Sequence, residues 1–152
     1  MNTFCRYVRL TPFERRIVFQ GALGLAMTWA GLRMIGFGRW KRVVARWTLV
    51  DRVGCDGGRI ASICETIIRM QVAAERYFLK PSCLEHSLVL WWLLRRHGVL
   101  ANVCIGGRKE QGRFAAHAWV EVDGVPVGDV DGAHRHFAPF DGPVTLMENQ
   151  TR

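Results

Sequence analysis

Three residues whose side chains can together carry out acyl transfer lie in the second half of the chain: Cys83, His117 and Asp129. A cysteine thiolate attacks a carbonyl carbon, a histidine moves the proton, and a carboxylate orients the imidazole. Most free cysteines are small buried hydrophobic residues without chemistry. These three residues are therefore candidates for a catalytic site only if the surrounding elements bring them together.

Two other residues compete for the same roles. Asp131 lies two positions after Asp129 and on the same predicted strand face, so either carboxylate can be the one that orients the imidazole. His86, three residues after Cys83, is a second candidate base. It suits the role less well, because a base in the same helical turn as the thiol leaves little room for a substrate between them.

The sequence from residue 82 to residue 98 predicts one helix with Cys83 at its start. Ser82 is suited to be the N-cap, Glu85 completes a capping box, and Gly98 supplies a left-handed C-terminal stop. Apolar residues cover most of this helix, which predicts that it is buried. The positive end of the helix dipole favours a thiolate in the first turn, and the unpaired N–H groups there can bind an oxyanion.

The sequence after Gly98 changes to a period of two, which predicts strands. We expect a strand over 99–105, a polar connection over 108–112, a second strand over 114–122 and a return segment over 125–131. Pro126 restricts the return segment to a sheet edge or a bulge. The tail from residue 132 is expected to be mostly irregular.

The turn at Asp123-Gly124 decides whether the candidate residues share a face of the sheet. A two-residue turn would put His117 and Asp129 on opposite faces. A three-residue loop over 122–124, with its glycine in the left-handed conformation, instead puts them directly opposite each other. Because the site requires a shared face, we predict this bulged turn or an equivalent one-residue offset at Gly128.

The first half of the chain is expected to be helical. Thr11, Pro12 and Glu14 predict a helix start, and the uncharged apolar run over 17–32 is shorter than the roughly 20 residues that cross a bilayer. We interpret this run as a buried core helix, with an interfacial membrane helix as the alternative. The expected order is then a break at 36–38, a basic helix over 39–49, a linker over 51–58 and a helix over 59–78.

Composition narrows the class of protein. The 152 residues are enough for one compact unit, with a helical region over 1–78 and a core over 79–152. Five cysteines without paired spacing or a secretory signal indicate reduced thiols in the cytoplasm. His134 and His136 lack paired ligands, so we expect no metal and no cofactor. The net charge of +8 favours acidic partners, but no nucleic-acid-binding motif accompanies it.

Two stretches resemble the transglutaminase-like leader peptidases of lasso-peptide biosynthesis. The first runs from Cys83-Leu84 through Ser87-Leu88 to Gly98, and the second is the run over 117–124, which begins His-Ala-Trp, followed by Asp129. The N-terminal helices are similar to the helical region that these peptidases carry ahead of their catalytic core. The resemblance implies an α+β fold with a papain- or transglutaminase-like core, in which the helix that carries the cysteine packs on a small antiparallel sheet.

The resemblance also implies a function: a cysteine peptidase that removes the leader from a ribosomally made precursor, with Cys83, His117 and Asp129 as its catalytic residues. It implies three partners, namely the precursor peptide, a separate leader-recognition protein and the lasso cyclase. We expect no nucleic-acid or membrane partner. Two other functions stay open, a non-catalytic scaffold for leader and cyclase, and a different acyl transfer on the same fold.

Overall fold

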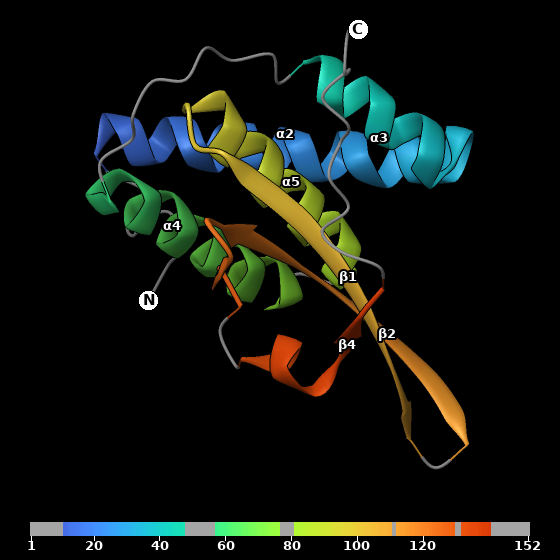
Figure 1. The fold of residues 1–152 in the computed structure, drawn as a ribbon. Helices are drawn as coiled ribbons and strands as arrows, with labels where there is room; N and C mark the ends of the chain where they lie inside the picture. The colour runs from blue at the N-terminus through green and yellow to red at the C-terminus, as the bar shows by residue number, and fades with distance from the viewer. Residues whose placement is uncertain (1–10, 48–56, 77–80, 111, 130–131, 141–152) are drawn as a thin grey trace, which may run out of the picture.

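The computed structural model describes residues 11–47, 57–76, 81–110, 112–129 and 132–140. Its elements are four helices and a four-stranded antiparallel sheet of order β3-β2-β1-β4 (Figure 1). The elements follow the chain as α2 (Pro12–Ile35), α3 (Phe37–Arg46), α4 (Gly57–Arg76), α5 (Cys83–Arg96), β1 (Ala101–Glu110), β2 (Arg113–Val122), β3 (Val125–Val127), the 3-10 helix η1 (Ala133–His136) and β4 (Ala138–Pro139). The fold is therefore α+β, as predicted, with a helical region ahead of the sheet.

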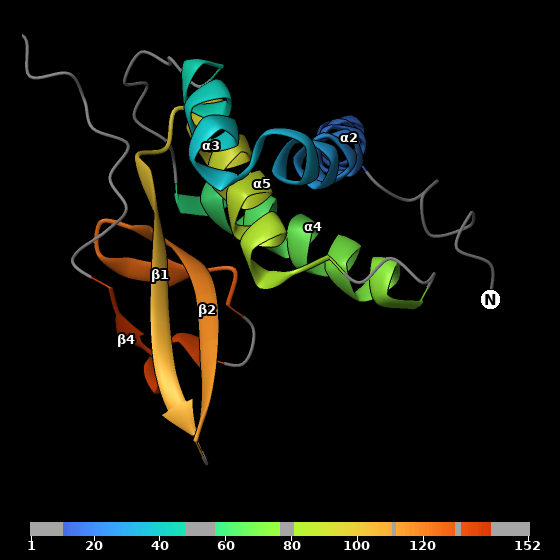
Figure 2. The same cartoon turned by 90° about the vertical axis from the view of Figure 1, so that its right-hand side faces the viewer.

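Helix α5 is the central element of the fold. It contacts α2 and α4 on one side and β1 and β2 on the other (Figures 1 and 2). Its side chains Trp91, Leu93 and Leu94 are almost completely buried, as the apolar sequence of this helix predicts. The indole N–H of Trp91 donates a hydrogen bond of 2.9 Å to the carbonyl of Ala101. This bond satisfies a buried polar group and fixes α5 on the first residue of β1.

The helices α2 and α3 form a tight pair because two glycines permit it. Gly36, with φ of 75°, lies between them, and α3 begins directly afterwards at Phe37, so the predicted break over 36–38 is confined to one residue. A Cβ atom at Gly31 would lie 2.2 Å from an atom of the Trp40 ring. The indole thus packs on the bare backbone of α2, and no larger residue fits there.

The predicted starts of α2 and α5 are confirmed, whereas α3 and α4 each begin two residues earlier than predicted. Thr11 caps α2 with a complete capping box, in which its hydroxyl accepts from the N–H of Glu14 at 3.2 Å and the Glu14 carboxylate accepts from the N–H of Thr11 at 2.7 Å. Among the described residues, no helix is both long enough and apolar enough to cross a bilayer. Residues 48–56 and 77–80, which include most of the predicted linker, lie outside the described residues.

The sheet differs from its prediction in the length of β1 and in the added strand β4. The strand predicted over 99–105 runs instead from Ala101 to Glu110, so the expected polar connection is largely strand. The tail is not mostly irregular: η1 is followed by β4, which pairs with Gly106 and Gly107 of β1. These contacts join residues far apart in the sequence, which local periodicity cannot indicate. Pro126 does lie in an edge strand, β3, as predicted.

The hairpin register also differs from the prediction. Val122 pairs with Val125, so the turn at Asp123-Gly124 has two residues, and the bulged three-residue loop is wrong. Both turn residues have positive φ, 50° and 77°, which is the geometry of a tight hairpin turn that Asp-Gly favours. The positive φ predicted for the glycine is confirmed, but the turn does not supply the predicted offset.

Candidate functional site

Cys83 is the first residue of α5 and its side chain is half-buried. The cap that places it there is the predicted one. The Ser82 hydroxyl accepts from the N–H of Glu85 at 3.3 Å, and the Glu85 carboxylate accepts from the N–H of Ser82 at 2.7 Å. The negative charge of Glu85 is therefore held on the cap, at the positive end of the helix dipole.

The first turn of α5 offers backbone donors beside the thiol. The helical ladder begins with the N–H of His86, which donates to the carbonyl of Ser82 at 3.1 Å. The N–H groups of Cys83 and Leu84 precede this bond, and no described residue accepts from them. An anion that forms at the cysteine can thus be stabilised by donors that need no rearrangement.

His117 lies in the middle of β2, opposite Gly106 of β1. Its ring is walled by two aromatic rings, with centroid distances of 6.2 Å to Trp119 and 5.1 Å to Phe137. A Cβ atom at Gly106 would lie 2.7 Å from the carbonyl oxygen of Ala138 and 3.0 Å from the Trp119 ring. The glycine therefore lets β4 and the indole close around the strand that carries the imidazole.

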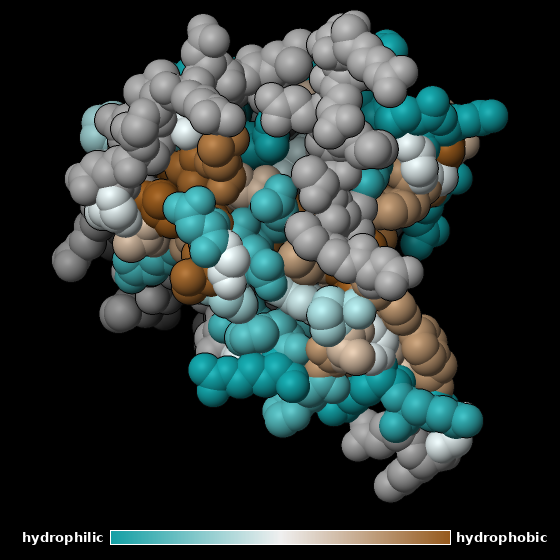
Figure 3. Space-filling model, in the orientation of Figure 1, coloured by the Kyte–Doolittle hydropathy of each residue, from teal (hydrophilic) through white to brown (hydrophobic). Residues whose placement is uncertain are grey.

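His117 and the core valines of β2 occupy opposite faces of the sheet. Val120 and Val122 belong to the core that packs on the helices. Because side chains alternate along a strand, His117 and Trp119 point to the other face. The surface on that side, over η1, is largely hydrophilic (Figure 3), and Arg135 is among its exposed residues.

Asp129 reaches the face of His117 because of Gly128. The β2–β3 ladder ends at the pair of Val120 with Val127, and a regular continuation would turn Asp129 toward the core face. Gly128 has φ of 73°, which ends the strand and reverses the direction of the next side chain. The alternative prediction of an offset at Gly128 is therefore the one that the backbone supports, and His117 Nε2 lies 3.9 Å from Asp129 Oδ1.

Asp129 is hydrogen-bonded more closely to a second histidine. The Oδ2 atom lies 2.7 Å from His134 Nδ1 and accepts from the backbone N–H of His134 at 2.8 Å. Burial acts to raise the pKa of Asp129, but these two hydrogen bonds and the charges of His117 and His134 lower it below its usual value. The result is one ionised carboxylate placed between two imidazoles.

The structure thus brings together two of the three predicted residues directly. His117 and Asp129 belong to one cluster, while Cys83 lies on α5, whose first turn is next to β2 (Figure 2). No hydrogen bond joins the Cys83 thiol to His117 in the part of the chain that the structure describes. Hydrogen bonds between catalytic groups are often longer before substrate binds.

The structure describes only one of the two alternative residues, His86 and Asp131. His86 is buried within α5, so a substrate cannot reach it from solvent, and Asp131 lies outside the described residues. His134 was considered only as a metal ligand in the sequence, yet it holds Asp129. The signal that could have found it is its place five residues after Asp129, within a turn short enough for both its N–H and its ring to return to that carboxylate.

The other described thiols are poor nucleophiles. Burial raises the pKa of Cys64 to about 11. Burial, together with a hydrogen bond and the charge of Glu121, raises the pKa of Cys104 to about 12. Both groups stay protonated near neutral pH, and only the thiolate attacks. In the described ranges, no group of three or more histidine, cysteine or acidic side chains is arranged to hold a metal ion.

Comparison with known proteins agrees with this fold. The family model described as transglutaminase-like superfamily matches residues 31–140, which is more than half of the chain. The chain therefore belongs to the transglutaminase-like superfamily, whose members are typically cysteine-dependent enzymes and include peptidases and acyl transferases. Neither the curated proteins nor the solved structures gave a match. The division of the chain at residue 78 stays a prediction.

Proposed function

We propose that this protein is a cytoplasmic cysteine peptidase that removes the leader from a ribosomally made lasso-peptide precursor. The observation that carries the proposal is the distance of 3.9 Å between His117 Nε2 and Asp129 Oδ1. The chain belongs to a family whose members are typically cysteine-dependent enzymes, and Cys83 lies at a capped helix start. The resemblance of the Cys83 and His117 stretches to the leader peptidases supports the choice of substrate.

In the proposed reaction the Cys83 sulfur attacks the scissile carbonyl carbon while His117 takes the thiol proton. The Nε2 atom of His117 faces Asp129, so Nδ1 is the nitrogen left for the thiol. The carbon–nitrogen bond then breaks, the imidazolium gives its proton to the leaving amine, and the acyl group stays on sulfur as a thioester. Water attacks the thioester, His117 accepts the proton of the water and returns it to sulfur, and the free acid leaves.

The route by which the thiol meets the imidazole is set by the sheet. His117 points away from the helix-packed face, so the proposed reaction requires the Cys83 thiol to reach the imidazole past an edge of β2. Among the described residues, β3 pairs with β2 only over 120–122, so the β3 side of β2 is unpaired before Val120. This open edge is also where an extended substrate can lie between nucleophile and base.

The test is mass spectrometry of a candidate precursor incubated with this protein and its recognition partner. We expect leader removal by the wild type and none by Cys83→Ala, whereas Cys64→Ala, which removes a buried thiol, should retain it. Asp129→Asn should keep more activity than His117→Ala, since an orienting carboxylate takes no part in bond making. Cleavage by Cys83→Ala at the wild-type rate would refute the peptidase, and transfer of the leader to an added amine would indicate another acyl transferase.

A further inference from the structure

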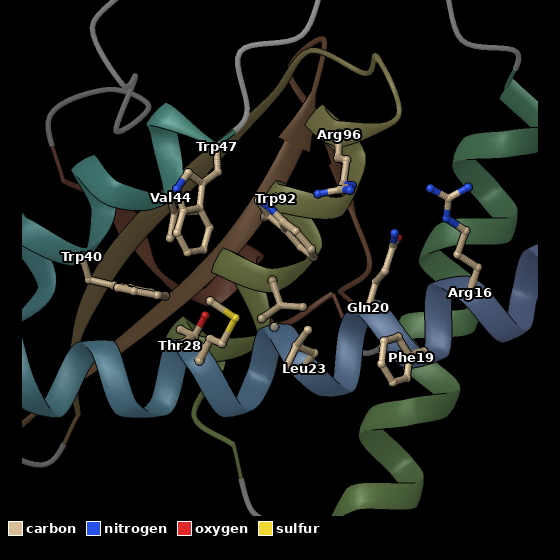
Figure 4. Close-up of a pocket in the computed structure, with 13 residues that line it drawn as sticks. Arg16, Phe19, Gln20, Leu23, Thr28, Trp40, Val44, Trp47, Trp92 and Arg96 are labelled. Carbon is tan, nitrogen blue, oxygen red and sulfur yellow. The ribbon is translucent and has the colours of Figure 1, made fainter.

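A groove lies on the helical side of the molecule, between α2, α3 and α5 (Figure 4). Its volume is about 480 Å³. The residues of α5 that line it, Val89, Trp92 and Arg96, belong to the later turns of the helix, whereas Cys83 is the first residue. The groove is therefore separate from the candidate catalytic cluster, and no step of the proposed reaction uses it.

The walls of the groove are mainly apolar. Figure 4 shows Trp47 and Trp92 on its two sides and Leu23 below them. Phe19, Leu23 and Trp47 each line the groove and are at least half exposed to solvent. Large apolar side chains gathered in this way on a surface indicate a site for a partner.

Buried polar atoms distinguish this groove from a purely apolar one. The indole nitrogens of Trp40 and Trp92 and the side-chain oxygen of Gln20 are buried, and none has a hydrogen-bond partner among the described residues. Leaving such a group unpaired costs about 1–3 kcal/mol. Because these atoms are shut off from solvent, a ligand reaches them only when the side chains that carry them turn toward the groove.

The charge of the groove limits the side chains of such a peptide. Arg16 and Arg96 line one end, near Gln20 (Figure 4), and no acidic residue is among the lining residues. The Arg96 guanidinium lies over the Trp92 ring, 5.3 Å from its centroid, and neither arginine forms an ion pair with a described residue. An acidic side chain of the ligand would meet two cations there that no described residue neutralises.

We propose that this groove binds an extended peptide segment that carries apolar side chains and, at one end, an acidic residue. The apolar side chains insert between Trp47 and Trp92, and the carboxylate meets Arg16 and Arg96. The segment belongs to the protein that delivers the precursor. Only this last assignment rests on the proposed function, because binding to the groove can be measured without cleavage.

The probe is a short fluorescein-labelled peptide of two glutamates followed by alternating phenylalanine, threonine and leucine, titrated with the full chain and followed by anisotropy. We expect saturable binding that Leu23→Glu weakens at least about tenfold, since it brings a like charge into the apolar wall. The matched control is Met34→Glu: Met34 is 82% exposed on the same helix but does not line the groove, so this variant should bind like the wild type. Replacing the two glutamates with lysines should weaken binding comparably.

The last variant lies outside the groove. Cys83→Ala should bind like the wild type, which separates failure of the groove from failure of the peptidase.

Four outcomes would overturn the proposal. The first two are equal binding of the glutamate and lysine peptides, and wild-type binding by Leu23→Glu. The third is sedimentation with phosphatidylserine vesicles that Leu23→Glu and Met34→Glu both abolish, which would make the apolar surface a membrane contact. The fourth is a dimer in light scattering that Leu23→Glu dissociates, which would assign the groove to a second copy of the chain.

Discussion

Asp129 is the residue on which most of the local interactions converge, because it faces His117 and is hydrogen-bonded to His134. A residue that holds this carboxylate without touching the thiol is a positioning residue. The sequence predicted Asp129 only as the partner of His117, because a catalytic imidazole needs a carboxylate to orient it. The required chemistry does not call for the second histidine, so only its place five residues after Asp129 could have indicated it.

We expect His134→Ala to lower kcat about tenfold with little change in KM, because a charge-assisted hydrogen bond that fixes the carboxylate is lost. The pKa of Asp129 is lowered in part by that bond, so in the variant it rises. Activity that needs the ionised carboxylate should then be lost at a higher pH on the acidic side of the profile. His134→Gln, which restores a donor, should recover part of the rate. A proportional loss at every pH would point to a structural role instead.

The described thiols should also differ in reactivity. Brief treatment of the folded protein with iodoacetamide at about pH 8 should modify Cys83, which is half-buried, and spare Cys64 and Cys104, whose pKa values are about 11 and about 12. Peptide mapping by mass spectrometry measures the extent at each site, and the unfolded protein is the control in which all three react. Modification of Cys104 in the folded protein as fast as Cys83 would contradict this expectation.

At the scale of elements, local signals predicted the helix starts better than the sheet. Thr11 and Ser82 specify their capping boxes within four residues, so the starts of α2 and α5 follow from the sequence alone. The pairing of β4 with Gly106 depends on residues more than thirty positions away, and no local pattern encodes it. The prediction of a bulged turn was wrong because the change of side-chain direction that brings Asp129 to the face of His117 occurs at Gly128, not at the turn.

Gly128→Ala should therefore damage both stability and activity. Its φ of 73° disfavours any Cβ, and that Cβ would lie 2.4 Å from a methyl carbon of Leu90. The matched control is Gly124→Ala, which has φ of 77° but open space around it. We expect a loss of about 1 kcal/mol for the control and about 2–4 kcal/mol for Gly128→Ala in urea unfolding, with the larger loss of activity at Gly128. Equal losses would mean that Leu90 can move aside.

At the scale of the whole molecule, the two sides of α5 carry different surfaces. The sheet side holds His117 and Asp129, and the helical side holds the apolar groove with Arg16 and Arg96. The composition shows a basic chain and so favours acidic partners, but it could not predict the groove, which exists only where three helices meet. The net charge of +8 attracts acidic groups over a distance, whereas the proposed binding in the groove rests on short-range contacts.

The proposed function predicts that the isolated protein turns over precursor slowly and that the recognition partner accelerates it. A bound partner raises the effective concentration of the scissile bond to about the millimolar range. We expect the acceleration to fall when ionic strength is raised from about 0.05 M to about 0.5 M, because screening weakens the contact with the exposed arginines. Rates measured with and without partner at each salt concentration provide the test. Full turnover by the isolated chain at micromolar precursor would rule the dependence out.

The order of the residues along the chain sets the order in which a ribosome delivers them. Cys83 and His117 are made before Asp129, His134 and Phe137. Asp129 and Phe137 lie next to the His117 imidazole, and His134 is hydrogen-bonded to Asp129. A growing chain folds its earlier elements first, so α5 and the hairpin can form before the carboxylate has emerged. A nascent chain would then carry the thiol and the imidazole without the groups that orient them. Translation itself thus delays the moment at which the candidate site is complete.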